Sequence, residues 1–343
     1  MKFPIIENEV MLDELLSQPD VAVIELMKRL EGDIIILGIG GKMGLTLGRL
    51  AVNAIAAAGV KKRVVGVSRF SNPAARSQLE AWGIETISCD LLDRDAVDAL
   101  PEIKNVIFMA GRKFGTGGEE DLTWAMNTLV PGNVGLKFKD SRIVAFSTGC
   151  VYPLVEIENG GCNELTAAAP VGEYAQSCLG RERVFEYYAK NFNTSVTLFR
   201  LNYAIDLRYG VLHDIAQQIW NDEPVNNSVG HFNLIWQGDA NRRALLCLEY
   251  CESPAAIMNI TGPETVTVNY VAEAFSKIMG KKITYAGTAG KRCYLNNAAK
   301  SFAEFGYPTV SIDEMIRAQA QWIIAGKHSL GKPTHFEVND GKF

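Results

Sequence analysis

Residues 32–44 read Gly32-Asp33-Ile34-Ile35-Ile36-Leu37-Gly38-Ile39-Gly40-Gly41-Lys42-Met43-Gly44, and this short segment sets the expected architecture. The apolar run at 34–37 is typical of a strand buried on both faces, and residues 43–58 predict the helix that follows. Between them, Gly38 permits a tight turn, Gly41 lets a ligand approach the backbone, and Gly44 lets helix and strand pack closely. This arrangement predicts a dinucleotide whose pyrophosphate lies at the helix N-terminus, where N–H groups carry partial positive charge.

Strand and helix patterns alternate onward from this loop. Further strands are predicted at 63–67, 84–88, 106–109, 143–146 and 195–199, and helices at 73–82, 119–130 and 173–190. The alternation predicts an α/β protein with a Rossmann-type doubly wound parallel sheet. We expect a helical extension over 1–31, the dinucleotide-binding domain over 32–202 with 235–262 returning to it, and a smaller C-terminal substrate-binding cap over 203–234 and 263–343.

The segment before the glycine loop is predicted to be helical. Residues 8–31 show an apolar periodicity typical of one or two amphipathic helices. We expect the apolar side chains to pack on the outside of the sheet; they are Leu12, Leu15, Leu16, Val23, Leu26 and Leu30.

Composition limits the partners of the 343-residue chain. Its formal net charge is −5 and its Lys and Arg residues are not clustered, so the sequence predicts neither a nucleic-acid nor a membrane partner. No apolar run approaches the roughly 20 residues of a membrane span, and Glu7 and Glu9 interrupt any signal-peptide region. Seven scattered cysteines without CxxC spacing predict no metal site and a cytoplasmic location.

The end of the second predicted strand bears on the choice of cofactor. It reads Val67-Ser68-Arg69-Phe70, with no acidic residue to accept the ribose 2′-hydroxyl of NAD. Arg69 offers a planar fork suited to the 2′-phosphate of NADP. The sequence therefore favours NADP, with NAD as the alternative.

Several motifs together resemble the extended short-chain dehydrogenase/reductases, the NAD-dependent epimerase/dehydratase superfamily. Gly38-x-x-Gly41-x-x-Gly44 resembles the family's glycine loop, Cys89-Asp90-Leu91-Leu92-Asp93 its acidic adenine-binding motif, and 106–111 the motif that lines the cofactor. The resemblance runs over roughly residues 32–320. It implies a homodimer and cofactor contacts from Gly38, Gly40, Gly41, Lys42, Met43, Gly44, Ser68, Arg69, Asp90, Leu91, Ala110, Gly111 and Arg112.

The same resemblance implies the catalytic residues. The motif at 143–152 places Thr148 at the family's catalytic Ser/Thr position, and Tyr174 matches the tyrosine of Tyr-x-x-x-Lys. The expected chemistry is hydride transfer by an NAD(P)-dependent oxidoreductase, epimerase or dehydratase on a sugar or sugar-derived substrate. The chain departs from the family at Cys178, which stands where the lysine is expected.

That departure has a physical consequence. A phenol with a pKa of about 10 is a poor base near neutrality, and the family lysine lowers this value with its charge. Another cation can serve, and we favour Arg112 or Lys113 over Arg181, which must span about 10 Å of helical rise. Alternatively, Cys178 is a nucleophile, a proton carrier or a small filler, or the protein is a non-catalytic NAD(P)H-binding sensor or scaffold.

The substrate side carries weaker signals. Residues 111–118 form a glycine-rich basic loop that includes Lys113 and is suited to clamping a phosphate or carboxylate. Asn202 and Tyr203 follow the predicted strand at 195–199, where the family often contacts substrate. The Tyr-Gly-Pro expected next is absent, which argues against a direct transfer of a nucleotide-sugar site.

Overall fold

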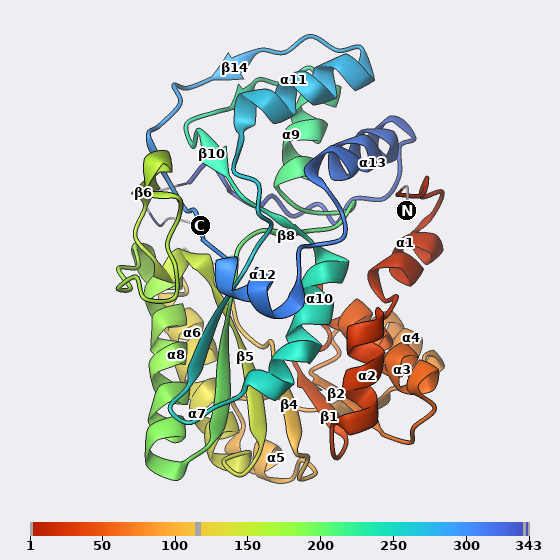
Figure 1. Cartoon of the computed structure of the whole chain (residues 1–343), viewed down its shortest axis with the longest axis vertical. Coiled ribbons are helices and arrows are strands. Elements are labelled where there is room, and N and C mark those ends of the chain that lie inside the picture. The colour runs from red at the N-terminus through yellow and green to blue at the C-terminus, as the bar shows by residue number, and fades with distance from the viewer. Residues whose placement is uncertain (1–2, 114–117, 339–340, 342–343) are drawn as a thin grey trace.

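A seven-stranded parallel sheet, with helices on both faces, occupies the lower half of the molecule in Figure 1. The computed structural model describes residues 3–113, 118–338 and 341. The strand order is β12-β7-β5-β4-β1-β2-β3. The strands are β1 (Ile34–Leu37), β2 (Val64–Ser68), β3 (Glu85–Ser88), β4 (Asn105–Phe108), β5 (Arg142–Thr148), β7 (Ser195–Leu201) and β12 (Ala256–Ile260).

The register of the sheet positions the glycine loop. All four side chains of β1 are buried, as expected for a parallel strand covered on both faces. Leu37 pairs with Val67 of β2 and with Phe108 of β4. The order of connection reverses between β1 and β4, so the residue after Leu37 lies at the switch point where open α/β sheets bind ligands.

Helices cover both faces of the sheet, and alternate residues of β1 divide the core. Ile34 and Ile36 face the core beneath α2 (Val21–Arg29), α3 (Gly44–Ala58), α4 (Pro73–Ala81) and α10 (Gln237–Leu246). Ile35 and Leu37 face the core beneath α5 (Arg94–Asp98), α7 (Val130–Lys137) and α8 (Gly172–Phe192). The doubly wound Rossmann-type fold predicted from the sequence is confirmed.

The helix predicted over 119–130 differs from the structure. It consists of α6 (Glu120–Trp124), a π-helical turn η1 (Ala125–Leu129), and α7, which continues to Lys137. Pro131 lies in the first turn of α7, and its missing N–H removes one α-helical bond at the point where the turn widens. The edge strand β12 was expected only as part of the returning segment 235–262, without separate bounds.

The remaining elements build a further core above the sheet, which we call the cap core. It joins α9 (Val211–Trp220), α11 (Val268–Met279) and α13 (Ile312–Ile324), which lie together in the upper half of Figure 1. Smaller elements are α12 (Ala299–Phe305) and the two-stranded pairs β8 (Ala204–Ile205) with β11 (Ile235–Trp236), β10 (His231–Phe232) with β13 (Val266–Thr267), β14 (Tyr285–Ala286) with β9 (Val225–Asn226), and β15 (Arg292–Cys293) with β6 (Val155–Glu156).

The N-terminal segment does not act as one unit. Val23 and Leu26 of α2 pack on the sheet side, as predicted, whereas Leu12 and Leu16 of α1 (Glu9–Leu16) belong to the cap core. The expectation that all the apolar residues of 8–31 pack on the sheet was therefore wrong for α1. The helix ends at Leu16 and a new one starts after Asp20, so the chain changes direction between them.

Candidate active site

The glycine loop between β1 and α3 combines two crowded positions with one open position. Gly38 has a φ of 92°, and a Cβ there would stand 2.7 Å from the backbone nitrogen of Ala110. Gly44 is equally constrained, because a Cβ would collide with the carbonyl oxygen of Ile39. That contact lies within the loop itself, rather than between helix and strand as expected.

Gly41 is the open position of the loop. It is exposed, and the closest atom to an added Cβ would be the Gly38 carbonyl oxygen at 3.4 Å, an ordinary contact. The helix α3 that follows begins at Gly44, and the N-cap residue Met43 provides no side-chain hydrogen bond to its first turn. An uncapped helix N-terminus beside unfilled space fits an anion such as the pyrophosphate of a dinucleotide.

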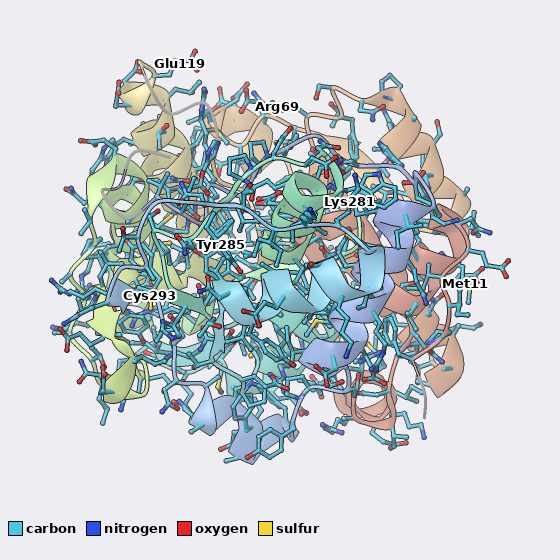
Figure 2. All side chains as sticks on the ribbon, turned by 90° about the horizontal axis from the view of Figure 1, so that it is seen from above. Met11, Arg69, Glu119, Lys281, Tyr285 and Cys293 are labelled. Atoms are coloured by element: carbon cyan, nitrogen blue, oxygen red, sulfur yellow. The ribbon has the colours of Figure 1, made fainter. Side chains whose placement is uncertain are left out.

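The residues expected at the adenosine end lie along the same edge of the sheet. Ser68 ends β2, and a Cβ on Gly40 would stand 2.6 Å from its hydroxyl oxygen. Arg69 is exposed and labelled in Figure 2. The Asp90 side chain accepts from the Leu92 backbone at 3.1 Å and is otherwise exposed, while Leu91 is buried.

Asn127, in the π-helical turn η1, joins the loop after β4 to α8. Its side-chain oxygen accepts from the Arg112 backbone at 3.0 Å and from Arg181 at 2.5 Å. Its amide group donates to the Ser177 hydroxyl at 2.9 Å. A Cβ at Gly111 would collide with the Arg181 guanidinium, so a side chain there would displace Arg181 from its contacts. The loop that follows Ala110 is therefore held against the helix that carries Tyr174.

Thr148 and Tyr174 share Cys150 as a neighbour. The Thr148 hydroxyl accepts from the Cys150 backbone at 3.2 Å and so caps the short turn Gly149–Val151. Tyr174, on the first turn of α8, packs against Cys150. The structure therefore brings the two expected catalytic residues to the end of β5. Cys150 was not singled out from the sequence, although it stands two residues after Thr148 in the same motif.

The environment of Tyr174 keeps its phenol protonated. Burial raises its pKa well above 10, and the neighbouring Cys178 and Cys150 thiols raise it further. The Tyr174 hydroxyl donates a hydrogen bond to the Cys178 sulfur, which also favours the neutral phenol. The positive charge of Arg181 opposes these effects.

Cys178 is completely buried and packs with Val151, Tyr152 and Cys162. Burial raises the pKa of its thiol, so the thiol is the stable form near neutrality. A reactive cysteine requires the opposite, an accessible thiolate. These contacts support the interpretation of Cys178 as a small filler.

Three cationic side chains lie near Tyr174 and Cys178, and each has different surroundings. Arg181 is 7% exposed and donates to the Phe146 carbonyl at 2.8 Å, which fixes the position of its charge. The helical rise between Tyr174 and Arg181 therefore does not keep Arg181 away from this region. Arg112 forms an ion pair with Glu119. Burial lowers the pKa of Lys113, and its charge interacts with Cys150 and Cys178. The remainder of the glycine-rich loop, residues 114–117, lies outside the described residues.

The two residues expected after β7 have different surroundings. Asn202 is buried and donates to the side-chain oxygen of Asn233 at 2.7 Å. Tyr203 is partly exposed, and burial together with the nearby Cys150 raises the pKa of its phenol. Asn202 therefore holds neighbouring loops together, whereas Tyr203 lies near Cys150, the neighbour of Tyr174.

Other features of the described residues lie away from this site. Two surface hollows are lined by Glu7–Val10 with Trp322, Lys327 and His328, and by residues 139–142 with Lys104, Phe192, Asn193 and Ser195. Residues 3–113, 118–338 and 341 contain no group of three His, Cys, Asp or Glu side chains placed to hold a metal. Over the same residues no helix is long and apolar enough to cross a membrane.

Comparison with known proteins gives the class of this site. Residues 34–205 match the family described as NAD dependent epimerase/dehydratase family, which is half of the chain. The chain therefore belongs to the NAD-dependent epimerase/dehydratase family. No curated protein sequence matches it significantly.

Solved structures share the fold at low sequence identity. UDP-glucuronic acid 4-epimerase from Bacillus cereus, in complex with NAD, is 21% identical with a TM-score of 0.72 over 85% of this chain and 99% of its own. UDP-glucose 4-epimerase from Thermotoga maritima, with UDP-glucose, is 17% identical with a TM-score of 0.69 over 86% and 99%. WbmG from Bordetella bronchiseptica, with NAD and UDP, is 17% identical with a TM-score of 0.69 over 89% and 100%.

Proposed function

We propose that the protein is an NAD(P)-dependent oxidoreductase of the epimerase or dehydratase type that acts on a sugar nucleotide or a related sugar derivative. The observation that carries the proposal is that Thr148 and Tyr174 both contact Cys150, just after β5, on the same sheet edge as the open Gly41 loop. Support for the sugar nucleotide comes from the ligands of similar structures, which include UDP-glucose and UDP-glucuronic acid.

In the proposed mechanism, one set of residues binds the cofactor and another transfers the proton. The glycine loop and the start of α3 hold the pyrophosphate, and the nicotinamide supplies a hydride acceptor or donor when it is bound. Thr148 orients the reacting oxygen of the substrate. Tyr174, kept neutral by burial, holds the proton at its phenol oxygen and donates it to that oxygen as a general acid.

Proton abstraction in the opposite direction requires a nearby positive charge, and we assign this role to Lys113 together with Arg181. Lys113 interacts electrostatically with the two thiols that flank Tyr174, and Arg181 acts on Tyr174 directly. A neighbouring cation favours the phenolate and so lowers the barrier to proton removal. Arg112 is less suited, because its guanidinium pairs with Glu119.

Tyr174→Phe tests the proposed function. The substitution removes only the proton-transfer group, so turnover should fall by about 100-fold or more while NADH and NADPH binding stays within about twofold. Sugars, sugar acids and nucleotide sugars are first screened by absorbance of the reduced cofactor. Cys178→Ser is the matched control, and a filler cysteine predicts nearly parental turnover. Full activity of Tyr174→Phe would rule out the mechanism.

A second candidate, a non-catalytic NAD(P)H sensor, is favoured by one observation. Cys178 replaces the expected lysine, and the resulting environment raises the pKa of Tyr174. Tight binding of reduced cofactor without turnover across the whole substrate panel would support this candidate over the enzyme.

We also propose that NADP is preferred, through Arg69. The residue follows β2, is exposed, and has no acidic residue beside it to receive the 2′-hydroxyl of NAD. Arg69→Ala should weaken NADPH binding by about tenfold and leave NADH binding within twofold, because only the 2′-phosphate contact is lost. Fluorescence titration of both cofactors measures the difference, and Arg76→Ala, a change of a nearby exposed arginine, is the control. Equal NADH and NADPH affinities before and after the Arg69 change would contradict the preference.

Two properties of the whole protein complete the proposal. Exposed apolar side chains near α7 and α8, Leu129 and Tyr187, support a homodimer, which analytical ultracentrifugation tests. All seven cysteines lie among the described residues and none forms a disulfide, which supports a reducing, cytoplasmic location.

A further inference from the structure

The side chain of Lys42 extends from the glycine loop to residues of a different part of the chain. Its ammonium donates to the carbonyl oxygen of Ala204 in β8 at 3.0 Å and lies 4.2 Å from the centre of the Tyr209 ring. Both partners come from the segment that leads from β7 into α9. One side chain therefore connects the predicted pyrophosphate site to the cap.

The charges that face Lys42 do not neutralise it. Asp206 attracts the ammonium, but its carboxylate already accepts from Arg208 at 2.6 and 3.0 Å. Arg208 and Lys113 repel it. Among residues 3–113, 118–338 and 341, no carboxylate lies within the 4 Å of an ion pair with Lys42. Lys42 is partly buried, and an ammonium in these surroundings is destabilised until an anion is supplied.

A second observation indicates where that anion would lie. The adjacent Gly41 is the open position of the loop. The helix α3, which begins at Gly44, has no side-chain cap. An ammonium has three N–H donors, and the bond to Ala204 uses one. Backbone N–H groups and the Lys42 side chain can therefore bind one anion together.

We propose that Lys42 binds the pyrophosphate of the dinucleotide through its side chain and, through Ala204 and Tyr209, couples cofactor binding to the docking of the cap. The inference rests on the proposed function insofar as that function requires a dinucleotide. It adds a positioning residue that connects the two parts of the protein, whereas the family resemblance implies for Lys42 only a cofactor contact within the loop.

The coupling has a pH signature. Burial lowers the pKa of Lys42 to about 8 in the cofactor-free chain, and a bound pyrophosphate favours the charged form. Of the groups that face it, Arg208 stays charged, and burial keeps the Tyr209 phenol neutral by raising its pKa. Burial also lowers the pKa of Lys113, so the experiment includes a variant of that residue. Binding at pH 8 should then take up about 0.5 proton, and affinity should fall about tenfold from pH 7 to pH 9.

Calorimetric titration with NADH, at pH 8 in two buffers of different ionisation enthalpy, tests the inference. The parent should take up about 0.5 proton per NADH. Lys42→Arg, which keeps the charge without titrating, should bind NADH with no proton uptake. Lys42→Met should bind about tenfold more weakly at pH 7 and also take up no proton. Lys113→Arg is the matched control and should retain the uptake. Thermal unfolding of each variant verifies that it folds.

Hydrogen exchange over residues 203–212 tests the coupling to the cap. NADH should slow exchange there in the parent and in Lys42→Arg, but not in Lys42→Met. Uptake that persists in Lys42→Arg but vanishes in Lys113→Arg would overturn the inference, as would equal protection in Lys42→Met. Failure of the parent to bind NADH would overturn the proposed function and the inference together, so the two failures can be told apart.

Discussion

At Gly41, the requirements of cofactor binding and of folding can be separated. Its neighbours Gly38 and Gly44 are needed for the loop to form, because a Cβ at either position would collide with backbone atoms. Gly41 has no such collision, so a side chain there would fill only the space next to the helix N-terminus. Packing does not require glycine at this position, whereas the proposed cofactor does.

We therefore expect Gly41→Val to fold and to lose binding of both NADH and NADPH by at least 100-fold, because its side chain would occupy the place of the pyrophosphate. Calorimetry measures binding, and circular dichroism verifies the fold. Gly132→Ala is the control, since an added Cβ at Gly132 on α7 meets no atom within 4 Å. Unchanged binding in a folded Gly41→Val protein would place the cofactor elsewhere.

The helix α8 carries both the proposed chemistry and a large part of the internal polar network. Tyr174 and Cys178 lie on its first turns, and the buried Glu182 follows one turn later. Glu182 accepts from Arg200 of β7 at 2.9 and 2.6 Å and from the Ser147 hydroxyl of β5 at 2.5 Å. These bonds hold the helix against the two strands whose ends form the site.

Glu182→Gln should lower the free energy of unfolding by about 3–5 kcal/mol, because it leaves the buried Arg200 guanidinium without its counter-charge. Urea unfolding measures the loss. The exposed pair Arg183–Glu186 on the same helix supplies the comparison, and Glu186→Gln should cost about 0–1 kcal/mol. Similar losses in the two variants would mean that the buried pair does not hold α8 in place.

At the scale of the whole molecule, the chain has cores on both faces of the sheet and another in the cap, and the N-terminal helices touch two of these. Leu12 of α1 packs in the cap core, while Leu26 of α2 packs on the sheet. Arg208 adds a polar connection, pairing with Asp13 of α1 at 2.9 Å and with Asp206 at 3.0 Å. Asp206 in turn faces Lys42, so α1 is connected to the surroundings of the glycine loop.

Leu12→Ala should destabilise the protein by about 2–5 kcal/mol, because Leu12 is fully buried and its truncation leaves a cavity in the cap core. Trp236 and Trp322 lie in the same core, so tryptophan fluorescence during urea unfolding reports the change. Val10→Ala on the same helix, at a position 65% exposed, should change stability by no more than about 0.5 kcal/mol. A Leu12→Ala midpoint equal to that of Val10→Ala would show that α1 does not contribute to the core.

Much of the fold follows from local patterns. The strands from β1 to β7 that were predicted appear within two residues of their expected bounds, because short apolar runs between turn signals identify strands buried in a parallel sheet. The three parts of the helix 119–130 could not be predicted in the same way, since a π-helical turn depends on packing against α8 as well as on Pro131. The placement of α1 in the cap core likewise depends on elements hundreds of residues away.

The sequence alone determined the glycine loop, the sheet around it, and the positions of Thr148, Tyr174 and Cys178, because these features depend on residue type and spacing along the chain. Only the tertiary structure decided which charges surround Tyr174 and where the Lys42 side chain reaches. Such neighbours come from elements far apart in sequence, and burial, which raises the pKa of one group and lowers that of another, is a property of the folded chain alone.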